Sequence, residues 1–434
     1  MRDSNLISQS ALIVQIQTQK IRKIQNFDNS FSEFRELALS AGANIEEEVT
    51  GKQDVISPRY FIKKGKLDEL KLIIDKTKVE LVIFNHLLTP SQEKNLESYL
   101  CARVLDRTGL ILDIFAKRAH SHVGKLQVEL AQLQHLSSRL VRGWSHLERQ
   151  KGGIGLRGPG ETQLETDRRL IGNRIKSIKK RLEKTHKQKS INRYSRKKGK
   201  NKIIALVGYT NAGKTTLFNK LTGDDQYQAD QLFATLDSVT RKNLNPGSRA
   251  ILFTDTVGFI SEIPTELIES FKATLDDLRT ADLLIHLVDI SDPDSIFKIR
   301  EVNNILTSMG AQEIPQLKVN NKIDLLTKED LLTKNIEERD AIFISAHASE
   351  GISFLKERII EMVCNGLFKG WLSVSHNAAK ERASLYKEGY VYEEIAHESV
   401  WHLKIVIGKD HLDDYLETEG VEFLSSSDKL EDIA

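Results

Sequence analysis

The chain has 434 residues, of which 40% are hydrophobic and 29% are charged. This length is too great for one compact domain and predicts about two to four. The two cysteines, Cys101 and Cys364, favour a reduced compartment over a disulfide framework or a cysteine-based metal site. No apolar run has transmembrane length and no secretory signal is visible, so we expect a cytoplasmic protein without a membrane partner.

Residues 1–116 alternate strand-like and helix-like segments. Ala11–Ile16 and Val79–Phe84 are apolar runs that predict buried strands, and Gln92–Leu100 has helical spacing. The pattern predicts a small N-terminal α/β domain, and this domain contains no phosphate-binding loop pattern.

Residues 117–190 predict an antiparallel helical hairpin. Apolar residues fall at helical spacing on both sides of Lys151–Gly160, which has five glycines in ten residues. This composition predicts a mobile or ligand-moulded tip, with a flexible connector as the alternative. A plain connector needs no cations, so the candidate RNA-binding residues are Arg149, Lys151, Arg157, Arg168 and Arg169.

The net charge of +2 is distributed unevenly. Arg168–Lys200 contains fifteen Lys or Arg and one acid, so the rest of the chain is acidic. A concentrated cationic element predicts a polyanionic partner, most simply RNA. A solvated helix face is one alternative; an anionic membrane surface is another, although no Trp or Phe lies on an opposite apolar face. Residues 191–200 are expected to form a basic linker to the next domain.

Gly208–Thr215 matches the phosphate-binding loop pattern G-x-x-x-x-G-K-[ST]. It follows Lys202–Val207, a predicted buried strand, and precedes helix-forming residues, which is the setting that a P-loop requires. Lys214 is expected to reach the β- and γ-phosphates, and the Thr215 hydroxyl to ligate Mg²⁺. A glycine-containing turn with an incidental lysine is the alternative. The other expected nucleotide contacts here are Gly208, Tyr209, Thr210, Asn211, Ala212, Gly213 and Thr216.

Ile251–Thr254 predicts a second strand, which leads into Asp255-Thr256-Val257-Gly258. The Asp255 carboxylate is expected to hold Mg²⁺ through water, and the Gly258 N–H to bond the γ-phosphate, so that this loop shifts on hydrolysis. Between the two motifs, Thr235 is the candidate switch threonine that ligates Mg²⁺. Thr240 and an ordinary loop threonine are the alternatives. The neighbours of Thr235 that are also expected to contact nucleotide are Phe233, Ala234, Leu236 and Asp237, and the catalytic residues expected are Lys214, Thr235 and Gly258.

Asn321-Lys322-Ile323-Asp324 follows a predicted strand and indicates guanine recognition. The Asp324 carboxylate can accept hydrogen bonds from guanine N1–H and the 2-amino group. Adenine lacks this donor pair, so the buried carboxylate would be left unpaired and ATP rejected. Asn321 can bond guanine O6 or tie its loop to the P-loop, and the Lys322 stem can stack on the base. The further expected base contacts are Ser345, Ala346 and His347, where the Ala346 N–H would donate to O6.

In Ras-type switches a glutamine follows the Asp-x-x-Gly motif and orients the attacking water. Here Phe259 occupies that position and can neither donate nor accept a hydrogen bond. Intrinsic hydrolysis is therefore expected to be slow unless a bound partner reorganises the switch loops. Alternatively, Phe259 packs and another switch residue serves. This GTP-binding domain is expected over residues 201–370, and a small α+β domain without assigned chemistry over 371–434.

The chain resembles the HflX-type GTPases. The segments similar to hallmarks of that family are Asp106–Phe115, Gly124–Leu133, Gly152–Arg169 and Asp255–Ile260, and the resemblance covers about residues 10–370. It implies an N-terminal subdomain and hairpin that insert near the peptidyl-transferase centre of the 50S subunit, ribosome-stimulated GTP hydrolysis, and splitting of stalled 70S ribosomes under stress. It also implies Thr235 as the Mg²⁺ ligand and Phe259 as a usual feature.

The fold class expected is α/β. A P-loop NTPase domain with a mostly parallel sheet is preceded by the small α/β domain and its hairpin, and is followed by the α+β domain. We expect a monomer. Two other functions stay open at this point: a GTPase that assists ribosome assembly or RNA modification, and a non-ribosomal switch whose basic helix binds a membrane or a protein.

Overall fold

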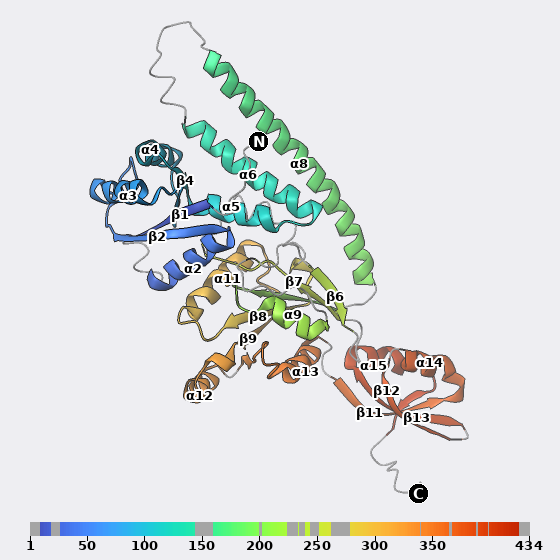
Figure 1. Cartoon of the computed structure of the whole chain (residues 1–434). Coiled ribbons are helices and arrows are strands. Elements are labelled where there is room, and N and C mark those ends of the chain that lie inside the picture. Colours follow the sequence, from blue (N-terminus) through green and yellow to red (C-terminus); the bar gives the residue numbers. More distant parts are fainter. Residues whose placement is uncertain are drawn as a thin grey trace.

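The computed structural model describes residues 9–18, 27–143, 159–198, 202–223, 233, 239–243, 251–261, 278–338, 340–363, 367–387, 389–397 and 399–424. They form an N-terminal α/β unit, a long helical hairpin, a second α/β unit with a six-stranded sheet, and a C-terminal sheet unit (Figure 1). This arrangement confirms the fold class predicted from the sequence.

The N-terminal unit is a parallel four-stranded sheet with the order β2-β1-β3-β4. Its two central strands are almost wholly buried, as expected for a parallel sheet covered on both faces. The charged β2 lies at the edge and was not predicted from the sequence. Its elements are β1 (Gln9–Gln17), α2 (Phe27–Ser40), β2 (Ala43–Lys52), α3 (Lys64–Thr77), β3 (Leu81–Phe84), α4 (Pro90–Leu100) and β4 (Arg103–Leu105).

Helix α5 (Arg107–Arg118) connects this sheet to the rest of the molecule. Asp106 caps it by accepting a hydrogen bond from the Gly109 N–H at 2.8 Å. Most of its first eight side chains are buried, because the helix contributes to an apolar core that continues into the second α/β unit. This shared core includes Phe115 of α5 and Phe259 and Ile260 beside the P-loop.

The hairpin consists of α6 (His122–Gly143) and α8 (Pro159–Lys198), which lie side by side (Figure 1). Its apolar seam consists of Leu126, Leu130, Ile178 and Leu182, with Val123, Leu133 and Ile175 packed against it. Helix α8 continues to Lys198, so most of the predicted linker 191–200 is helical, because Lys and Arg are good helix formers.

The second α/β unit has the sheet order β10-β9-β8-β5-β7-β6, in which only β6 is antiparallel to its neighbour. The mostly parallel sheet brings the carboxyl ends of β5, β7, β8 and β9 to one edge, where such folds bind ligands. Its elements are β5 (Lys202–Gly208), α9 (Lys214–Thr222), β6 (Val239–Asn243), β7 (Ile251–Asp255), β8 (Leu283–Asp289), α11 (Ser295–Ser308), β9 (Gln316–Asn321), α12 (Lys328–Glu337), β10 (Ile342–Phe343) and α13 (Ile352–Val363).

The C-terminal unit is an antiparallel sheet with the order β12-β13-β11-β14. Its β-α-β-β-α-β order and strand arrangement are those of a ferredoxin-like fold. The unit begins at Leu367 and not at residue 371 as predicted, because the first strand is longer than its apolar stretch suggested. Its elements are β11 (Leu367–Ser375), α14 (Ala379–Lys387), β12 (Val391–Ala396), β13 (Val400–Gly408), α15 (Lys409–Leu416) and β14 (Val421–Phe423).

Candidate nucleotide-binding site

The phosphate-binding loop lies between β5 and α9, at the carboxyl edge of the sheet. Two of its glycines are required by their surroundings. A Cβ at Gly208 would lie 2.3 Å from the Leu287 carbonyl oxygen, and one at Gly213 would lie 2.4 Å from the Asn321 side-chain nitrogen. Gly213 also has φ +91°, which favours glycine. The backbone can therefore turn tightly and approach a ligand closely.

The Lys214 ammonium is held in place by the loop itself. Its Nζ donates to the carbonyl oxygens of Gly208 at 3.1 Å and Tyr209 at 2.7 Å. A lysine ammonium has three N–H donors, and the loop engages two of them. Burial lowers the pKa of Lys214 to about 8, and the nearby Asp255 carboxylate partly opposes this change. A phosphate group beside Nζ would favour the charged form.

Thr215 and Asp255 meet at the end of the sheet. The Thr215 hydroxyl donates to the Asp255 carboxylate at 2.9 Å, and Asp255 is fully buried at the end of β7. The next residue, Thr256, donates through its hydroxyl to the Leu206 carbonyl at 2.6 Å and so fixes β7 against β5. Hydroxyl and carboxylate oxygens are the ligand types that Mg²⁺ prefers, so this pair fits a magnesium ion.

Gly258 and Phe259 lie directly on the P-loop. The Phe259 carbonyl accepts from the Thr210 N–H at 2.7 Å, and the Phe259 N–H donates to the Gly208 carbonyl at 3.1 Å. A Cβ at Gly258 would lie 2.8 Å from the Thr210 methyl carbon and 3.1 Å from Lys214 Nζ. Phe259 itself is only 2% exposed and packs in the shared core. The alternative in which Phe259 packs therefore agrees with its place in the structure.

The Asn-Lys-x-Asp loop is joined to the P-loop. Asn321 donates through its amide to the Ala212 carbonyl at 2.8 Å and accepts from the Ala346 N–H at 2.9 Å. Of the two roles left open for Asn321, the structure thus shows the link to the P-loop. Lys322 forms an ion pair with Asp289 at 2.7 Å. Asp324 is exposed, because it lies in the short 3₁₀ turn Ile323–Leu325 at the surface, so the burial expected for its carboxylate depends on a bound guanine.

The Ser345-Ala346-His347 segment lies beside this loop and follows β10. Ser345 and Ala346 are buried, whereas His347 is exposed. The Ser345 hydroxyl accepts from the Ala348 N–H at 3.0 Å and shapes the turn. The Ala346 N–H that was expected to donate to guanine O6 thus reaches Asn321 in this structure.

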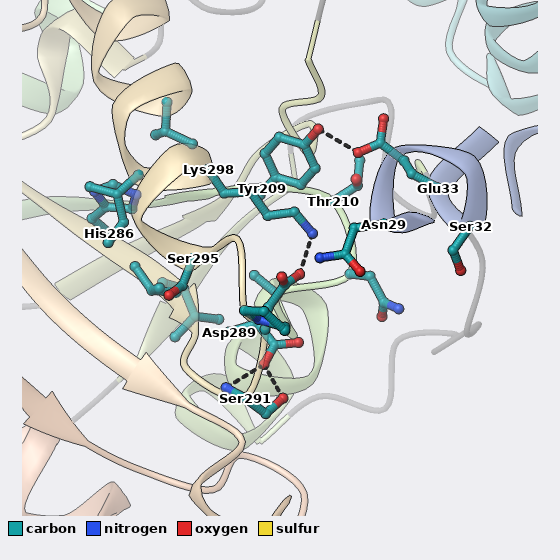
Figure 2. Close-up of a pocket in the computed structure, with 18 of the residues that line it drawn as sticks. Asn29, Ser32, Glu33, Tyr209, Thr210, His286, Asp289, Ser291, Ser295 and Lys298 are labelled. Carbon is teal, nitrogen blue, oxygen red and sulfur yellow. Dashed lines mark hydrogen bonds and ion pairs between the residues drawn. The ribbon is translucent and has the colours of Figure 1, made fainter. Parts of the chain in front are cut away.

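A cavity of about 290 Å³ adjoins the P-loop on the side of the N-terminal unit. Figure 2 shows that residues of α2, including Asn29 and Glu33, face Tyr209 and Lys298 across it. Asn29 donates to Asp294 at 2.8 Å, and the Lys298 ammonium lies 4.8 Å from the centre of the Tyr209 ring. The N-terminal unit therefore forms one wall beside the phosphate-binding loop.

A buried polar cluster joins the two α/β units at this wall. The Tyr209 hydroxyl donates to one Glu33 carboxylate oxygen at 2.6 Å and accepts from the Ser261 N–H at 2.7 Å. Arg107 donates to the other Glu33 oxygen at 2.7 Å and to the carbonyl and hydroxyl of Ser261, each at 3.2 Å. Burial and the neighbouring Glu33 raise the pKa of Tyr209 well above its usual value, so its hydroxyl keeps its proton.

Sequence reasoning did not identify Glu33 or Arg107 as functional residues. The available signal was an arginine at the start of an apolar helix, since Arg107 is 3% exposed and arginines are rarely buried without a partner. Its partners lie 74 and 154 positions away along the chain. No local pattern could indicate them.

The segment before β6 is described only at Phe233 and from Val239 onward. Phe233 is 2% exposed, and its ring centre lies 4.6 Å from that of Phe115 on α5. It therefore packs against the N-terminal unit. Thr240 lies in β6, with its hydroxyl 3.1 Å from that of Thr254, which argues against Thr240 as a switch ligand. The predicted contacts that lie outside the described residues are Ala234, Thr235, Leu236 and Asp237.

Of the candidate RNA-binding residues, Arg168 and Arg169 are exposed on α8. Arg149, Lys151 and Arg157 lie outside the described residues. Arg174, further along α8, pairs with Glu129 of α6 at 2.7 Å and so belongs to the hairpin contact. Within the described parts of the chain, no helix is both long enough and apolar enough to cross a membrane.

Three features together define a GTPase of the P-loop class. They are a P-loop on a mostly parallel sheet, a paired threonine and aspartate at the end of that sheet, and an Asn-Lys-x-Asp loop joined to the P-loop. Three family models match: "GTP-binding GTPase N-terminal" over residues 28–116, "GTP-binding GTPase Middle Region" over 118–196 and "50S ribosome-binding GTPase" over 203–322. The chain belongs to the HflX family of GTPases, as two relatives show.

The GTPase HflX of Escherichia coli K12 is 47% identical over 357 residues, which cover 82% of this chain and 84% of that one. The GTPase HflX of Caldanaerobacter subterraneus subsp. tengcongensis is 46% identical over 373 residues, or 84% of this chain and 85% of that one. A GDP complex of a Sulfolobus solfataricus GTP-binding protein aligns with a TM-score of 0.42 and 23% identity, over 82% of this chain and 99% of that one.

Proposed function

We propose that this GTPase binds the 50S subunit near the peptidyl-transferase centre and splits stalled 70S ribosomes under stress. The observation that carries the proposal is the shape and charge of the hairpin. It projects from the N-terminal unit, and α8 runs from its outer end back to the GTPase unit (Figure 1). The exposed cations of α8 supply the charge needed to contact rRNA phosphates.

The family supports the same partner. The model that matches residues 203–322 is described as a 50S ribosome-binding GTPase. In the proposed complex, Arg168 and Arg169 contact rRNA together with Arg149, Lys151 and Arg157 at the tip. Phosphate contacts position such a protein without reading sequence, so the shape of the rRNA site would provide the specificity.

The proposed nucleotide site uses the residues around the P-loop. Lys214 contacts the β- and γ-phosphates, Gly258 donates its N–H to the γ-phosphate, and the loop amides from Tyr209 to Thr216 surround the phosphates. Thr215, Thr235 and Asp255, the last through water, hold Mg²⁺, which neutralises phosphate charge when it is bound. Guanine covers the exposed Asp324 carboxylate, and its O6 shares the Ala346 N–H with the Asn321 side-chain oxygen.

The proposal separates nucleotide binding from ribosome splitting. Deletion of Gly152–Gly160 should leave GDP and GTP affinity within about twofold, because the P-loop lies in another unit. It should abolish the fall in light scattering that accompanies dissociation of 70S particles, together with most ribosome-stimulated hydrolysis. A glycine-serine replacement of equal length controls for the connection itself. Normal splitting by the deletion variant would show that the segment is only a connector.

Binding by phosphate contacts also makes a salt-dependent prediction. Cosedimentation with 50S subunits should weaken steeply with salt, and Arg168→Ala with Arg169→Ala should reduce the slope of log affinity against log salt by up to about two. Preference of the wild-type protein for assembly precursors over mature subunits would favour a role in ribosome assembly. Absence of salt-dependent cosedimentation would favour a non-ribosomal switch.

A further inference from the structure

We propose that helix α5 transmits the nucleotide state of the GTPase unit to the helical hairpin, and that the adjacent residues Asp106 and Arg107 are the joint. The inference depends on the GTPase activity and not on the proposed ribosomal function. It combines three contacts of α5, two with the switch segments and one with α6.

The first contact is between Arg107 and the segment that follows Gly258. The Arg107 guanidinium donates to the backbone carbonyl and the hydroxyl of Ser261, three residues after Gly258. Glu33 accepts from Arg107 and from Tyr209, so the P-loop side chain belongs to the same cluster. A change at Gly258 that moves Ser261 must therefore either break the hydrogen bonds between Ser261 and Arg107 or move α5 together with Ser261.

The second contact lies two turns further along the same helix. The Phe115 ring packs against Phe233, with ring centres 4.6 Å apart. Phe233 lies two residues before Thr235, the candidate threonine of the first switch segment. Both segments that are expected to respond to the γ-phosphate thus touch one helix, at its two ends.

The third contact connects α5 to the hairpin. The Asp106 carboxylate forms an ion pair with Arg139 of α6 at 2.8 Å, and Arg139 also pairs with Glu93 of α4. The joint therefore has two sides. Asp106 contacts the hairpin, and its neighbour Arg107 contacts the GTPase unit, with no residue between them.

The side chains on the GTPase side of the joint are buried and held by several hydrogen bonds, so they can transmit a displacement. Arg107 and Glu33 have side chains 3% and 9% exposed, so breaking their pair would leave a buried charge without its partner. Arg107 is further fixed by donating to Asn85 at 2.5 Å, and Asn85 donates in turn to Gln15 at 2.6 Å. These residues fill the carboxyl edge of the N-terminal parallel sheet, where a ligand crevice is usual in this topology. Here that edge contacts the neighbouring unit.

A coupling of this kind acts in both directions. If the GTP form moves Ser261 and α5, then displacement of the hairpin must change the preference for GTP over GDP by the same factor. A partner that binds the hairpin would thereby act on the switch segments.

The test is hydrogen–deuterium exchange of the full chain with GDP and with a non-hydrolysable GTP analogue. In the wild type, exchange in both 107–118 and 122–135 should differ between the two nucleotides. Arg107→Met should remove most of the difference in both segments. Asp106→Asn keeps a residue that can cap α5 but loses the charge facing Arg139, so it should retain the difference in α5 and reduce that in α6 at least threefold.

Two further variants guard against a simple loss of folding. Tyr209→Phe removes only the hydroxyl that links Glu33 to Ser261, and it should reduce the α5 difference while the protein stays folded, with a melting temperature lowered only by the loss of two hydrogen bonds. Arg35→Ala, on the same helix as Glu33 but in an exposed pair with Glu48, should behave as wild type. The proposal is overturned if the wild type shows no difference in α6, if Asp106→Asn leaves that difference intact, or if Arg35→Ala removes it.

Discussion

Asn321 donates a hydrogen bond to the Ala212 carbonyl at 2.8 Å, which joins the base-recognition loop to the phosphate-binding loop. The same side chain accepts from the Ala346 N–H. Three loops from different strands are therefore held together by one amide. Contacts within the protein set the relative positions of these loops, so the loops are largely preorganised for ligand binding.

The Asp324→Asn variant should exchange guanine for xanthine preference. The carboxylate accepts from two guanine donors, whereas an amide can donate to the 2-oxo group of xanthine. Loss of hydrogen bonds to a charged group should weaken GTP binding by about 10- to 100-fold, and competition assays with xanthosine triphosphate should show the gain. Glu337→Gln on α12 is the control for loss of an exposed charge. Equal competition by ATP and GTP in the wild type would disprove the assignment.

Removal of the hydroxyl at position 215 should impair hydrolysis more than folding. Thr215→Ala should lower GTP turnover by about two orders of magnitude, the size seen when one stabilising group is lost from an active site. Thr215→Ser keeps the hydroxyl and should retain most activity. Turnover is measured across a magnesium titration, and an EDTA-treated sample should be inactive. Equal activity of the alanine and serine variants would show that the Thr215 hydroxyl has no role in the site.

Two other residues of the proposed site give a related prediction. Lys214→Ala and Thr235→Ala should each abolish GTP turnover, but Thr235→Ala should retain GDP binding.

The Gly258→Ala variant, which adds a single methyl group, should impair GTP hydrolysis while leaving GDP binding almost unchanged. Its Cβ would lie 2.8 Å from the Thr210 methyl carbon and 3.1 Å from Lys214 Nζ, so the segment cannot stay where it is. We expect GDP affinity to change by less than about threefold and turnover to fall at least tenfold. Gly65→Ala, where a Cβ meets nothing within 4 Å, serves as control. A fully active Gly258→Ala enzyme would contradict the proposed role.

Two buried histidines predict sensitivity to acid. Burial lowers the pKa of His86 to about 3, with help from Arg107, and the pKa of His286 to about 4, with help from Lys318 and Lys214. Because these values lie below the unfolded value of 6.5, the unfolded chain binds more protons, and stability falls as pH decreases from 6.5 towards 4. At pH 5, each histidine should have lowered the free energy of unfolding by about 2 kcal/mol.

Urea unfolding at pH 7 and pH 5 measures this loss. His86 accepts a hydrogen bond from the Ile16 N–H at 2.8 Å, so His86→Gln preserves an acceptor while removing the titrating group. That variant should lose less stability on acidification than the wild type. A wild-type midpoint that is the same at both pH values would show that these histidines do not titrate as proposed.

The strands and motifs that a local pattern can specify were predictable from the sequence. The apolar runs of β1, β3, β5 and β7 predicted strands of the two α/β sheets, and the P-loop and Asn-Lys-x-Asp motifs indicated the parts of the nucleotide site. The edge strand β2 was missed because its Glu-Glu-Glu centre lacks an apolar face. The helical conformation of most of the segment 191–200 was not predicted, because charge alone does not distinguish a helix from a coil.

The joint between the units was beyond local reasoning for a different reason. Arg107 has partners on α2, on β3's carboxyl end and beside the P-loop, and only the folded chain brings these together. Similarly, Asp324 was expected to be buried because its ligand was considered with it. Its exposure in the protein alone follows from the short turn that carries it.

The core that α5 shares with Phe233, Phe259 and Ile260 also affects how the protein is made. Roughly 145 residues separate Phe115 from Ile260. At about 5–20 residues per second, synthesis of that stretch takes on the order of ten seconds. During this interval the N-terminal unit can form its sheet, but the apolar side of α5 still lacks its later partners. Nascent chains should therefore need protection at α5, and a fragment that ends after this helix should aggregate more readily than the full chain.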